Sequence, residues 1–260
     1  TQSGPMRQLL KITSLFALAF FFTAGMAFGQ DADVTQRSNQ NDATVEQSDG
    51  DDVADVFQNG IDNEATALQG GGSYIDQVQV GNNNEAFGSH SGDTYLTQEQ
   101  RGNQNEAYAW AKDDATVTQE QFGSKNLAQV GQSGDKYGPT TINQNSDVRQ
   151  FQSGDRNVAE IEVRQGNGRR NGFDQHQNGN SNTAKILDVG SGNAVTQIQV
   201  GNNNESVVGA RDVDPQLGEA DVFTEQRGHR NNATVGGGVG SYDATIEQFG
   251  NDNTATVTQN

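Results

Sequence analysis

The sequence contains no cysteine, only three prolines and a single tryptophan among its 260 residues. Without cysteine, an exported form of this protein has no disulfides to stabilise it. Basic residues are also scarce, because 16 Lys and Arg stand against 34 Asp and Glu, for a formal net charge of −18. A surface with this charge repels nucleic acid and anionic membranes, so we expect neither as a partner.

Long apolar runs are absent except for one near the beginning. The stretch Ile12–Phe22 is apolar, follows a short basic segment and precedes the small-residue pattern Ala27–Gly29. Eleven residues are too few to span a bilayer comfortably, and the pattern is typical of a secretory signal peptide. We therefore predict upstream residues and a signal peptide over 1–29 and a secreted domain without a membrane span over 30–260. A membrane anchor is the alternative.

The apolar residues that follow the predicted signal peptide are mostly alanine and valine. Removing the two basic residues of 1–29 leaves 14 basic and 34 acidic side chains, a net charge of 14 − 34 = −20. Such a composition cannot supply the apolar core expected for a domain of this length. Composition alone would therefore predict disorder. The internal repeats indicate otherwise.

A frame of the form Gln-x-Gly-x-x-Asn-x-Ala occurs ten times from one end of the predicted domain to the other. Successive frame glutamines are 22, 21, 21, 21, 31, 25, 22, 27 and 22 residues apart. Two copies are imperfect, with Ser38 in place of glycine and Ser206 in place of alanine. The frame glutamines and asparagines are Gln36, Asn41, Gln58, Asn63, Gln79, Asn84, Gln100, Asn105, Gln121, Asn126, Gln152, Asn157, Gln177, Asn182, Gln199, Asn204, Gln226, Asn231, Gln248 and Asn253.

Each copy has the pattern of a strand, a tight turn and a second strand. Before the frame glutamine the side chains alternate with period two, as in Leu96, Gln98 and Gln100, and the same alternation follows the frame asparagine. Between the strands, Gly-x-x-Asn offers residues that tolerate positive φ, as a tight turn requires. Two longer connections, Ser133–Thr141 and Gly209–Glu219, hold two of the prolines and are predicted to be loops.

Stacking of such units in register predicts an all-β solenoid. About ten strand–turn–strand repeats would form two facing parallel, in-register sheets of amyloid-like geometry, with rungs about 4.8 Å apart. Each frame glutamine and asparagine would then lie over its equivalent in the previous rung, and the amides would form hydrogen-bonded ladders in a core without large apolar residues. Carboxylates such as Glu99, Glu120, Asp93, Asp113, Asp114 and Asp155 would face outward or lie in loops. The predicted turn glycines are Gly60, Gly81, Gly102, Gly123, Gly154, Gly179, Gly201, Gly228 and Gly250.

The frame and its spacing near 22 residues resemble the curlin repeat, the unit of secreted bacterial proteins that assemble into extracellular functional amyloid. The resemblance extends over about residues 32–260. It implies a structural subunit of a cell-surface biofilm fibre, with itself as the main partner, together with a nucleator subunit and dedicated secretion and chaperone proteins. In this chain the first and last rungs, near Val34 and Thr254–Gln259, would present unpaired strand edges, and we expect no capping segment after the last repeat.

Other functions have less support in the sequence. The three histidines, His90, His176 and His229, lack the convergence that a metal or catalytic site needs, so exposed loop positions are expected for them. An acidic Ser48–Asp52 segment lacks the spacing of a calcium loop, and no catalytic or nucleotide-binding motif occurs in a usable context. We therefore expect no enzyme, metal or cofactor. A nucleator subunit of the same fibre, a monomeric adhesin and an ice-binding solenoid remain as alternatives.

Overall fold

The computed structural model describes residues 30–48, 51–112, 114–135, 138–140, 146–163, 171–188, 192–209, 217–236 and 240–258. The predicted signal peptide, residues 1–29, lies outside this part of the chain. Every regular element among the described residues is a β-strand. Accordingly, the described residues include no apolar helix of membrane-spanning length.

Two sheets of ten strands each make up the protein, and consecutive long strands alternate between them. The strands of sheet A are β1 (Asp31–Arg37), β3 (Val53–Ile61), β5 (Tyr74–Asn82), β7 (Tyr95–Asn103), β9 (Thr116–Ser124), β13 (Asp147–Ser153), β15 (Gly172–Asn178), β17 (Ala194–Asn202), β19 (Leu217–His229) and β21 (Gly240–Asn251). The strands of sheet B are β2 (Asp42–Gln47), β4 (Glu64–Gln69), β6 (Glu85–Ser91), β8 (Glu106–Lys112), β10 (Leu127–Val130), β14 (Val158–Val163), β16 (Thr183–Asp188), β18 (Glu205–Val208), β20 (Asn232–Gly236) and β22 (Thr254–Thr258).

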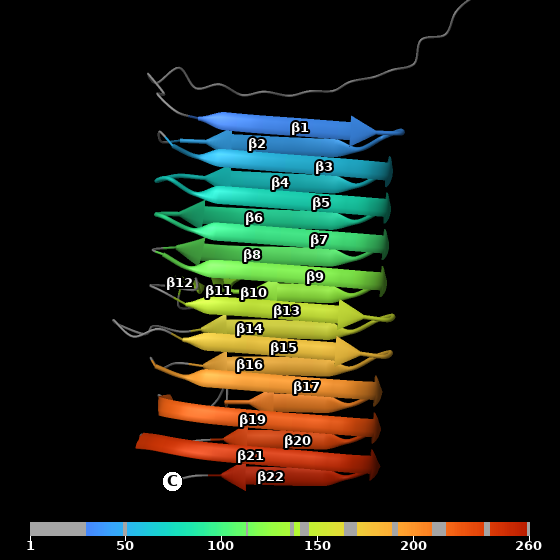
Figure 1. Cartoon of the computed structure of the whole chain (residues 1–260), viewed down its shortest axis with the longest axis vertical. Helices are drawn as coiled ribbons and strands as arrows, with labels where there is room; N and C mark the ends of the chain where they lie inside the picture. Colours follow the sequence, from blue (N-terminus) through green and yellow to red (C-terminus); the bar gives the residue numbers. More distant parts are fainter. Residues whose placement is uncertain are drawn as a thin grey trace, which may run out of the picture.

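One strand of sheet A and the following strand of sheet B form a rung, so that rung 1 is β1 and β2 and rung 10 is β21 and β22. Figure 1 shows the rungs stacked in sequence order along the long axis of the molecule. All neighbours within each sheet are parallel and in register: Gln100, for example, pairs with Gln79 on one side and Gln121 on the other. The predicted β-solenoid with two parallel, in-register sheets is therefore confirmed.

The core lies between the two sheets and follows the period of two that the sequence shows. In β7, Leu96, Gln98 and Gln100 are buried, whereas Tyr95 on the outer face is 61% exposed. Small side chains fill most of the apolar inner positions of sheet B, and Ala65, Ala107 and Ala128 are at most 1% exposed. Stacking in register allows this, because each rung covers the inner side chains of the rung before it.

The expectation of a core without large apolar residues is wrong. Phe173, Ile75, Leu96, Ile161 and Ile186 are among the largest fully buried side chains. Each of them occupies an inner position, and two pairs stack directly in register, Ile75 on Leu96 and Ile161 on Ile186, whereas Phe173 lies between two valines. The core is therefore an amide and alanine core with scattered bulky residues that fill it locally.

One of the two long connections is not simply a loop. Part of the segment predicted as a loop over Ser133–Thr141 forms a small antiparallel sheet, in which β11 (Gln132–Asp135) pairs with β12 (Gly138–Thr140). This hairpin is inserted between rungs 5 and 6, where the frame spacing is longest. The second connection lies largely outside the described residues, and its last residues, Leu217–Glu219, belong to β19.

The alternation of buried and exposed positions can be tested in β16, where two neighbouring residues offer a matched pair. Ile186 is fully buried, and Leu187 faces outward with partial exposure. We expect Ile186→Ala to lower the free energy of unfolding by about 2–5 kcal/mol, because it leaves a cavity in the core. Leu187→Ala removes the same number of carbon atoms and should cost less than about 1 kcal/mol. Urea denaturation of the monomer would measure both, and equal losses would contradict the assigned faces.

Candidate functional site

The frame glutamines form one continuous ladder through the interior. In every rung from 1 to 9 the glutamine donates its Nε2 to the Oε1 of the frame glutamine in the following rung, at 2.8 or 2.9 Å. Gln100 also donates Nε2 to the backbone carbonyl of Glu85 in sheet B, at 2.9 Å. In rungs 2 to 9 the frame amide therefore uses both of its hydrogens, one along the stack and one across it, and so links the two sheets.

The frame asparagines form a second ladder at the turn, and its bonds run in the opposite direction. Asn105 donates its backbone N and its Nδ2 to the Oδ1 of Asn84 in the previous rung, at 3.1 and 3.2 Å. Its Nδ2 also reaches forward to the carbonyl of Gly123, at 2.9 Å. The backward bond from N to Oδ1 recurs at every step from Asn253 to Asn41. The two ladders therefore make the stack directional: each frame glutamine donates to the glutamine of the following rung, and each frame asparagine donates to the asparagine of the previous rung.

The turn glycines allow the rungs to approach one another closely. Gly102 has φ +126°, and a Cβ built on it would lie 1.9 Å from the carbonyl oxygen of Gly123. The same obstruction, at 1.7–2.1 Å, recurs at the frame glycines of rungs 2 to 9. A side chain at these positions would separate the rungs. Gly250 in rung 10 differs, because its Cβ would meet only the Nδ2 of Asn253, at 3.6 Å.

The second positive φ of each turn is not on the asparagine, as the sequence suggested, but on the residue before it. Gln104 has φ +58° and Lys125 has φ +60°, and the equivalent residues of the other rungs have similar values. The reason is that the asparagine side chain points inward to its ladder, so the chain must reverse at the exposed position that precedes it.

The structure shows a second glutamine ladder, two residues before the frame glutamines, which the sequence analysis did not name among the candidate residues. Gln77 donates Nε2 to the Oε1 of Gln98 at 2.8 Å. The ladder continues through Gln119, Gln150, Gln175 and Gln197, again at 2.8 or 2.9 Å. The signal in the sequence was the repeated Gln-x-Gln pair. This file ends at rung 8, because Thr224 and Ile246 take the position in rungs 9 and 10.

Most carboxylates lie outside the core. Glu99 and Glu120 stand on the outer face of sheet A, whereas Asp93, Asp114 and Asp155 are exposed in turns; Asp113 lies outside the described residues. Neighbouring rungs can place like charges together. Asp76 pairs with Asp55 in register, and partial burial, followed by the charges of Asp55 and Glu99, raises the pKa of Asp76.

Buried Asp52 is an exception to this outward placement. Its Oδ1 accepts hydrogen bonds from the backbone N of Gly72 and of Ser73, both at 2.9 Å. These bonds compensate for the loss of hydration, so this carboxylate serves the connection between two rungs.

The expectation that the three histidines lie in exposed loops is wrong for all three. His90 is in β6 and only 5% exposed, His176 is exposed on β15, and His229 is exposed at the end of β19. They remain far apart in the rung order, in rungs 3, 7 and 9. The described residues also contain no group of three or more His, Asp or Glu that could hold a metal ion.

His90 interrupts a third file of amide side chains, which lies near the ends of the sheet B strands β2, β4 and β6. Gln47 donates Nε2 to the Oε1 of Gln69 at 3.2 Å, and His90 takes the next position. Its Nδ1 lies 2.9 Å from the Oγ1 of Thr94, while its Nε2 has no hydrogen-bond partner. Burial lowers the pKa of His90 to about 3, so the ring is neutral at physiological pH. Because a buried polar group without a partner costs about 1–3 kcal/mol, we expect His90 to weaken the stack locally.

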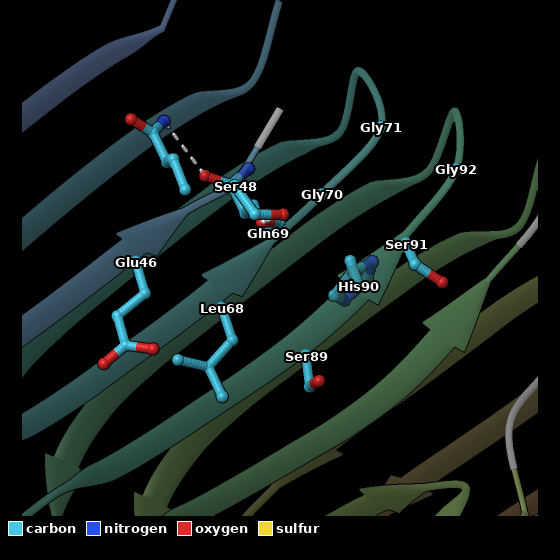
Figure 2. Close-up of a pocket in the computed structure, with 11 residues that line it drawn as sticks. Glu46, Ser48, Leu68, Gln69, Gly70, Gly71, Ser89, His90, Ser91 and Gly92 are labelled. Carbon is cyan, nitrogen blue, oxygen red and sulfur yellow. Dashed lines mark hydrogen bonds between the residues drawn. The ribbon is translucent and has the colours of Figure 1, made fainter. Parts of the chain in front are cut away.

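His90 also lines a shallow open hollow on sheet B. Figure 2 shows Glu46, Leu68 and Ser89 along the outer face of three adjacent strands, with the glycine turns at Gly71 and Gly92 beside them. The hollow arises where the small Ser89 follows the longer Leu68 in register. It contains one outward carboxylate and no group of convergent polar side chains, so the geometry does not indicate a catalytic site.

The two ends of the stack are the remaining candidate site. β1 and β2 at one end, and β21 and β22 at the other, have a hydrogen-bonded neighbour on one side only among the described strands. Inner residues there are partly exposed: Val34 in β1 and Ala255 and Val257 in β22 occupy positions that are buried in the middle of the stack. Within the described part of the chain, each end is therefore a strand pair with backbone groups and a strip of core that no further strand covers.

Residues 219–260 match the family model described as the curlin associated repeat. These residues are therefore similar to the curlin repeat. The match covers the last two rungs and confirms the resemblance to the curlin-repeat family. The other eight rungs share with them the frame, the register and both amide ladders. No curated protein matches the chain significantly.

The contribution of the ladder to curlin-repeat stability can be measured with one substitution at two places. Gln100→Met keeps the approximate side-chain size but removes the bonds from Gln79, to Gln121 and to Glu85. We expect a loss of about 3 kcal/mol, because the buried groups left behind cost about 1–3 kcal/mol each. Gln104→Met, at an exposed turn position, is the control and should be nearly neutral. Equal urea midpoints would show that the ladder does not stabilise the fold.

The neutral, buried His90 predicts a dependence of stability on pH. An unfolded histidine binds a proton below about pH 6.5, but folded His90 does so only near its lowered pKa of about 3. Between these values the unfolded state binds more protons, so stability falls as pH decreases, by up to about 1.4 kcal/mol per pH unit. His90→Gln should abolish this slope and extend the Gln47–Gln69 file, whereas His176→Gln should leave it unchanged. Urea denaturation at several pH values between 7 and 4 would measure this dependence. If the free energy of unfolding changed with pH equally in His90→Gln and in the original chain, the assignment of the slope to His90 would be contradicted.

Proposed function

We propose that this protein is the structural subunit of an extracellular, curli-like functional-amyloid fibre, in which copies assemble head to tail. In this role it serves a biofilm matrix and surface adhesion and has no enzymatic activity. The proposal rests on the curlin repeats and above all on one observation, the open strand pair at each end of the stack.

The direction of the stack supports head-to-tail rather than head-to-head contacts. Parallel strands in register can be extended by another strand of the same direction, and the first and last rungs carry the same frame glutamine, asparagine and alanine, with Ser38 in place of glycine in the first. A contact between two different ends of one molecule does not close on itself, so it generates a filament. Unpaired edges of regular strands are also the usual templates for such addition.

The outer faces are suited to a secreted fibre. Their carboxylates keep the subunit soluble before assembly, and cross-rung pairs such as Lys185 with Glu160, at 2.7 Å, offset part of the repulsion. We further propose export through the predicted signal peptide to a bacterial cell surface, with a nucleator subunit and dedicated secretion and chaperone proteins as partners. The proposed role needs no cofactor and no nucleic acid.

Two other roles for the same fold give different outcomes in the same experiment. A nucleator would assemble only weakly alone but would accelerate another subunit, and a monomeric adhesin would remain monomeric. An ice-binding solenoid would need a flat outward file of threonines. Here the outer file of sheet A that contains Thr97 and Thr118 continues with Arg149 and Asp174, which does not favour ice binding.

The direct test is a time course on purified residues 30–260, released from denaturant and followed by electron microscopy. The proposed function predicts unbranched fibres after a lag and loss of the lag when preformed fibres are added. A β-rich protein that stays monomeric at all concentrations would contradict it and favour adhesion.

A pair of substitutions in the last rung tests whether the end of the stack is the growing surface. Ala255 faces inward and is half-buried, whereas Thr256 faces outward. We expect Ala255→Lys to slow fibre elongation at least tenfold, because docking of a further rung would bury an unpaired charge. Thr256→Lys places the same charge on the outer face and should change the rate less than twofold. Seeded elongation measured by thioflavin fluorescence gives both rates.

The folded monomer serves as a control for this comparison. Both variants should keep the far-ultraviolet circular dichroism of the parent chain, since rung 10 has no described neighbour beyond it. Equal elongation rates for the two variants would contradict growth through the end of the stack.

A further inference from the structure

The ten rungs are not ten independent variants of one repeat but two versions of a block of five. Short sequence blocks recur in the same order five rungs apart, rather than between adjacent rungs. The blocks are QNG at 58–60 and 177–179, QVGNNNE at 79–85 and 199–205, EQRG at 99–102 and 225–228, and EQFG at 120–123 and 247–250. Rungs 2 to 5 therefore correspond to rungs 7 to 10. Rung 6 has the place in the second block that rung 1 has in the first, and the two share the frame glutamine, asparagine and alanine but no continuous stretch of sequence.

The structure aligns this duplication along one outer file of sheet A. The residue after the frame glutamine runs Asn, Val, Arg, Phe through rungs 2 to 5 and again Asn, Val, Arg, Phe through rungs 7 to 10. These residues are Asn59, Val80, Arg101 and Phe122, then Asn178, Val200, Arg227 and Phe249. The boundary between the blocks is the contact of rung 5 with rung 6, where the frame spacing is longest and the β11–β12 hairpin is inserted.

We infer that this internal contact is a covalently linked copy of the contact between subunits. Rung 10 of one chain would dock onto rung 1 of a second chain as rung 5 docks onto rung 6, with Gln248 over Gln36 and Thr256 over Thr44. The inference rests on the proposed function and specifies its partner surface and register. The partner is a second copy of this chain, bound through the face of β1 and β2.

The hydrogen-bonding groups at the two ends are complementary in this register. Across the internal contact, Gln121 donates Nε2 to the Oε1 of Gln152, at 2.9 Å, and Asn157 donates its backbone N to the Oδ1 of Asn126, also at 2.9 Å. In rung 10, the carbonyl of Asn232 is the only described acceptor for Nε2 of Gln248. Gln248 therefore has one amide hydrogen left for a following rung.

The other end offers the matching groups. Among the described residues no donor reaches the Oε1 of Gln36, and the Nδ2 of Asn41 turns back to the carbonyl of Arg37 in its own rung, at 2.8 Å. No described donor reaches the Oδ1 of Asn253 in rung 10. The second chain would thus accept from Gln248 and donate to Asn253, as rung 6 does with rung 5.

The outer face and the turn of rung 10 also leave room for a further rung. Phe249 is 61% exposed and would lie beside Arg37 of the second chain, whose guanidinium carbon is already 5.4 Å from the ring centroid of Phe57. Its counterpart Phe122 pairs in register with Ser153 and contacts Phe151 across the internal boundary, with ring centroids 5.7 Å apart. In rung 1 these two positions hold Arg37 and Thr35, so the ring of Phe249 would be covered by Arg37 and not by another ring. At the turn, the space over Gly250 is open, where the equivalent space over Gly123 holds a glycine carbonyl at 2.1 Å.

Disulfide trapping tests the register, since the chain has no cysteine of its own. In-register neighbours in parallel strands are about 4.8 Å apart, within the range that a disulfide bridges. Fibres of the double variant Thr256→Cys with Thr44→Cys should give, after oxidation and dissolution in denaturant without reductant, a ladder of covalent multimers. The two sites lie at opposite ends of one molecule, so the bonds can only join different chains.

The controls separate this register from other contacts. Thr256→Cys paired with Asp42→Cys is displaced by two residues along the strand and should give less than a tenth of the cross-linked product. Each single-cysteine variant should remain monomeric in denaturant, because head-to-tail contacts do not bring like sites together.

The contradicting outcomes are distinct. Fibres without cross-links in the Thr256 and Thr44 pair, equal cross-linking with Asp42, or dimers of a single-cysteine variant would overturn the inferred register and leave the proposed function standing. A chain that forms no fibres at all would overturn the proposed function and this inference with it.

Discussion

In-register stacking of side-chain amides is the interaction on which the rest of this structure depends. An amide both donates and accepts, so identical glutamines or asparagines can satisfy one another in file, whereas a file of buried carboxylates would repel itself. Each bond contributes only about 1 kcal/mol net. The frame ladder, however, repeats at every step and also ties sheet A to sheet B through bonds such as Gln100 to Glu85. This is how a chain poor in large apolar residues and without disulfides can hold a single β-fold.

The same stacking imposes the remaining constraints on the sequence. Rungs that approach so closely require glycine at the turn, since a Cβ at Gly102 would collide with the next glycine carbonyl. Positions that do not face the core are free to vary, and these carry the charge. Where the file is broken by a residue such as His90, a ring nitrogen is left without a partner. The stability of this protein therefore depends on how regularly the amide files repeat from rung to rung.

In a fold of this kind every rung presents hydrogen-bonding groups on both of its sides, so a further rung can be added at either end. Each rung completes the hydrogen bonds of the rung before it, so the outermost rungs retain groups that a further rung would satisfy. The asymmetry of the amide files gives these two ends different chemistry: among the described residues, one amide hydrogen of Gln248 has no acceptor and the Oε1 of Gln36 has no donor. The contact between rungs 5 and 6 is the internal contact on which the inferred register of two chains is based. In the proposed fibre, assembly would use the same kinds of bond that fold the monomer.

The sequence by itself determined the strand–turn–strand repeat, the parallel in-register sheets and the identity of the frame files, because a period of two and a spacing near 22 leave few other ways to bury Gln and Asn. Only the tertiary structure decided the opposite bond directions of the two ladders, the second ladder from Gln77 to Gln197 and the burial of His90. It also placed Phe173 and Ile186 in the core and formed the β11–β12 hairpin. These features depend on which rung lies above and below a residue, and that neighbourhood exists only once the rungs are stacked.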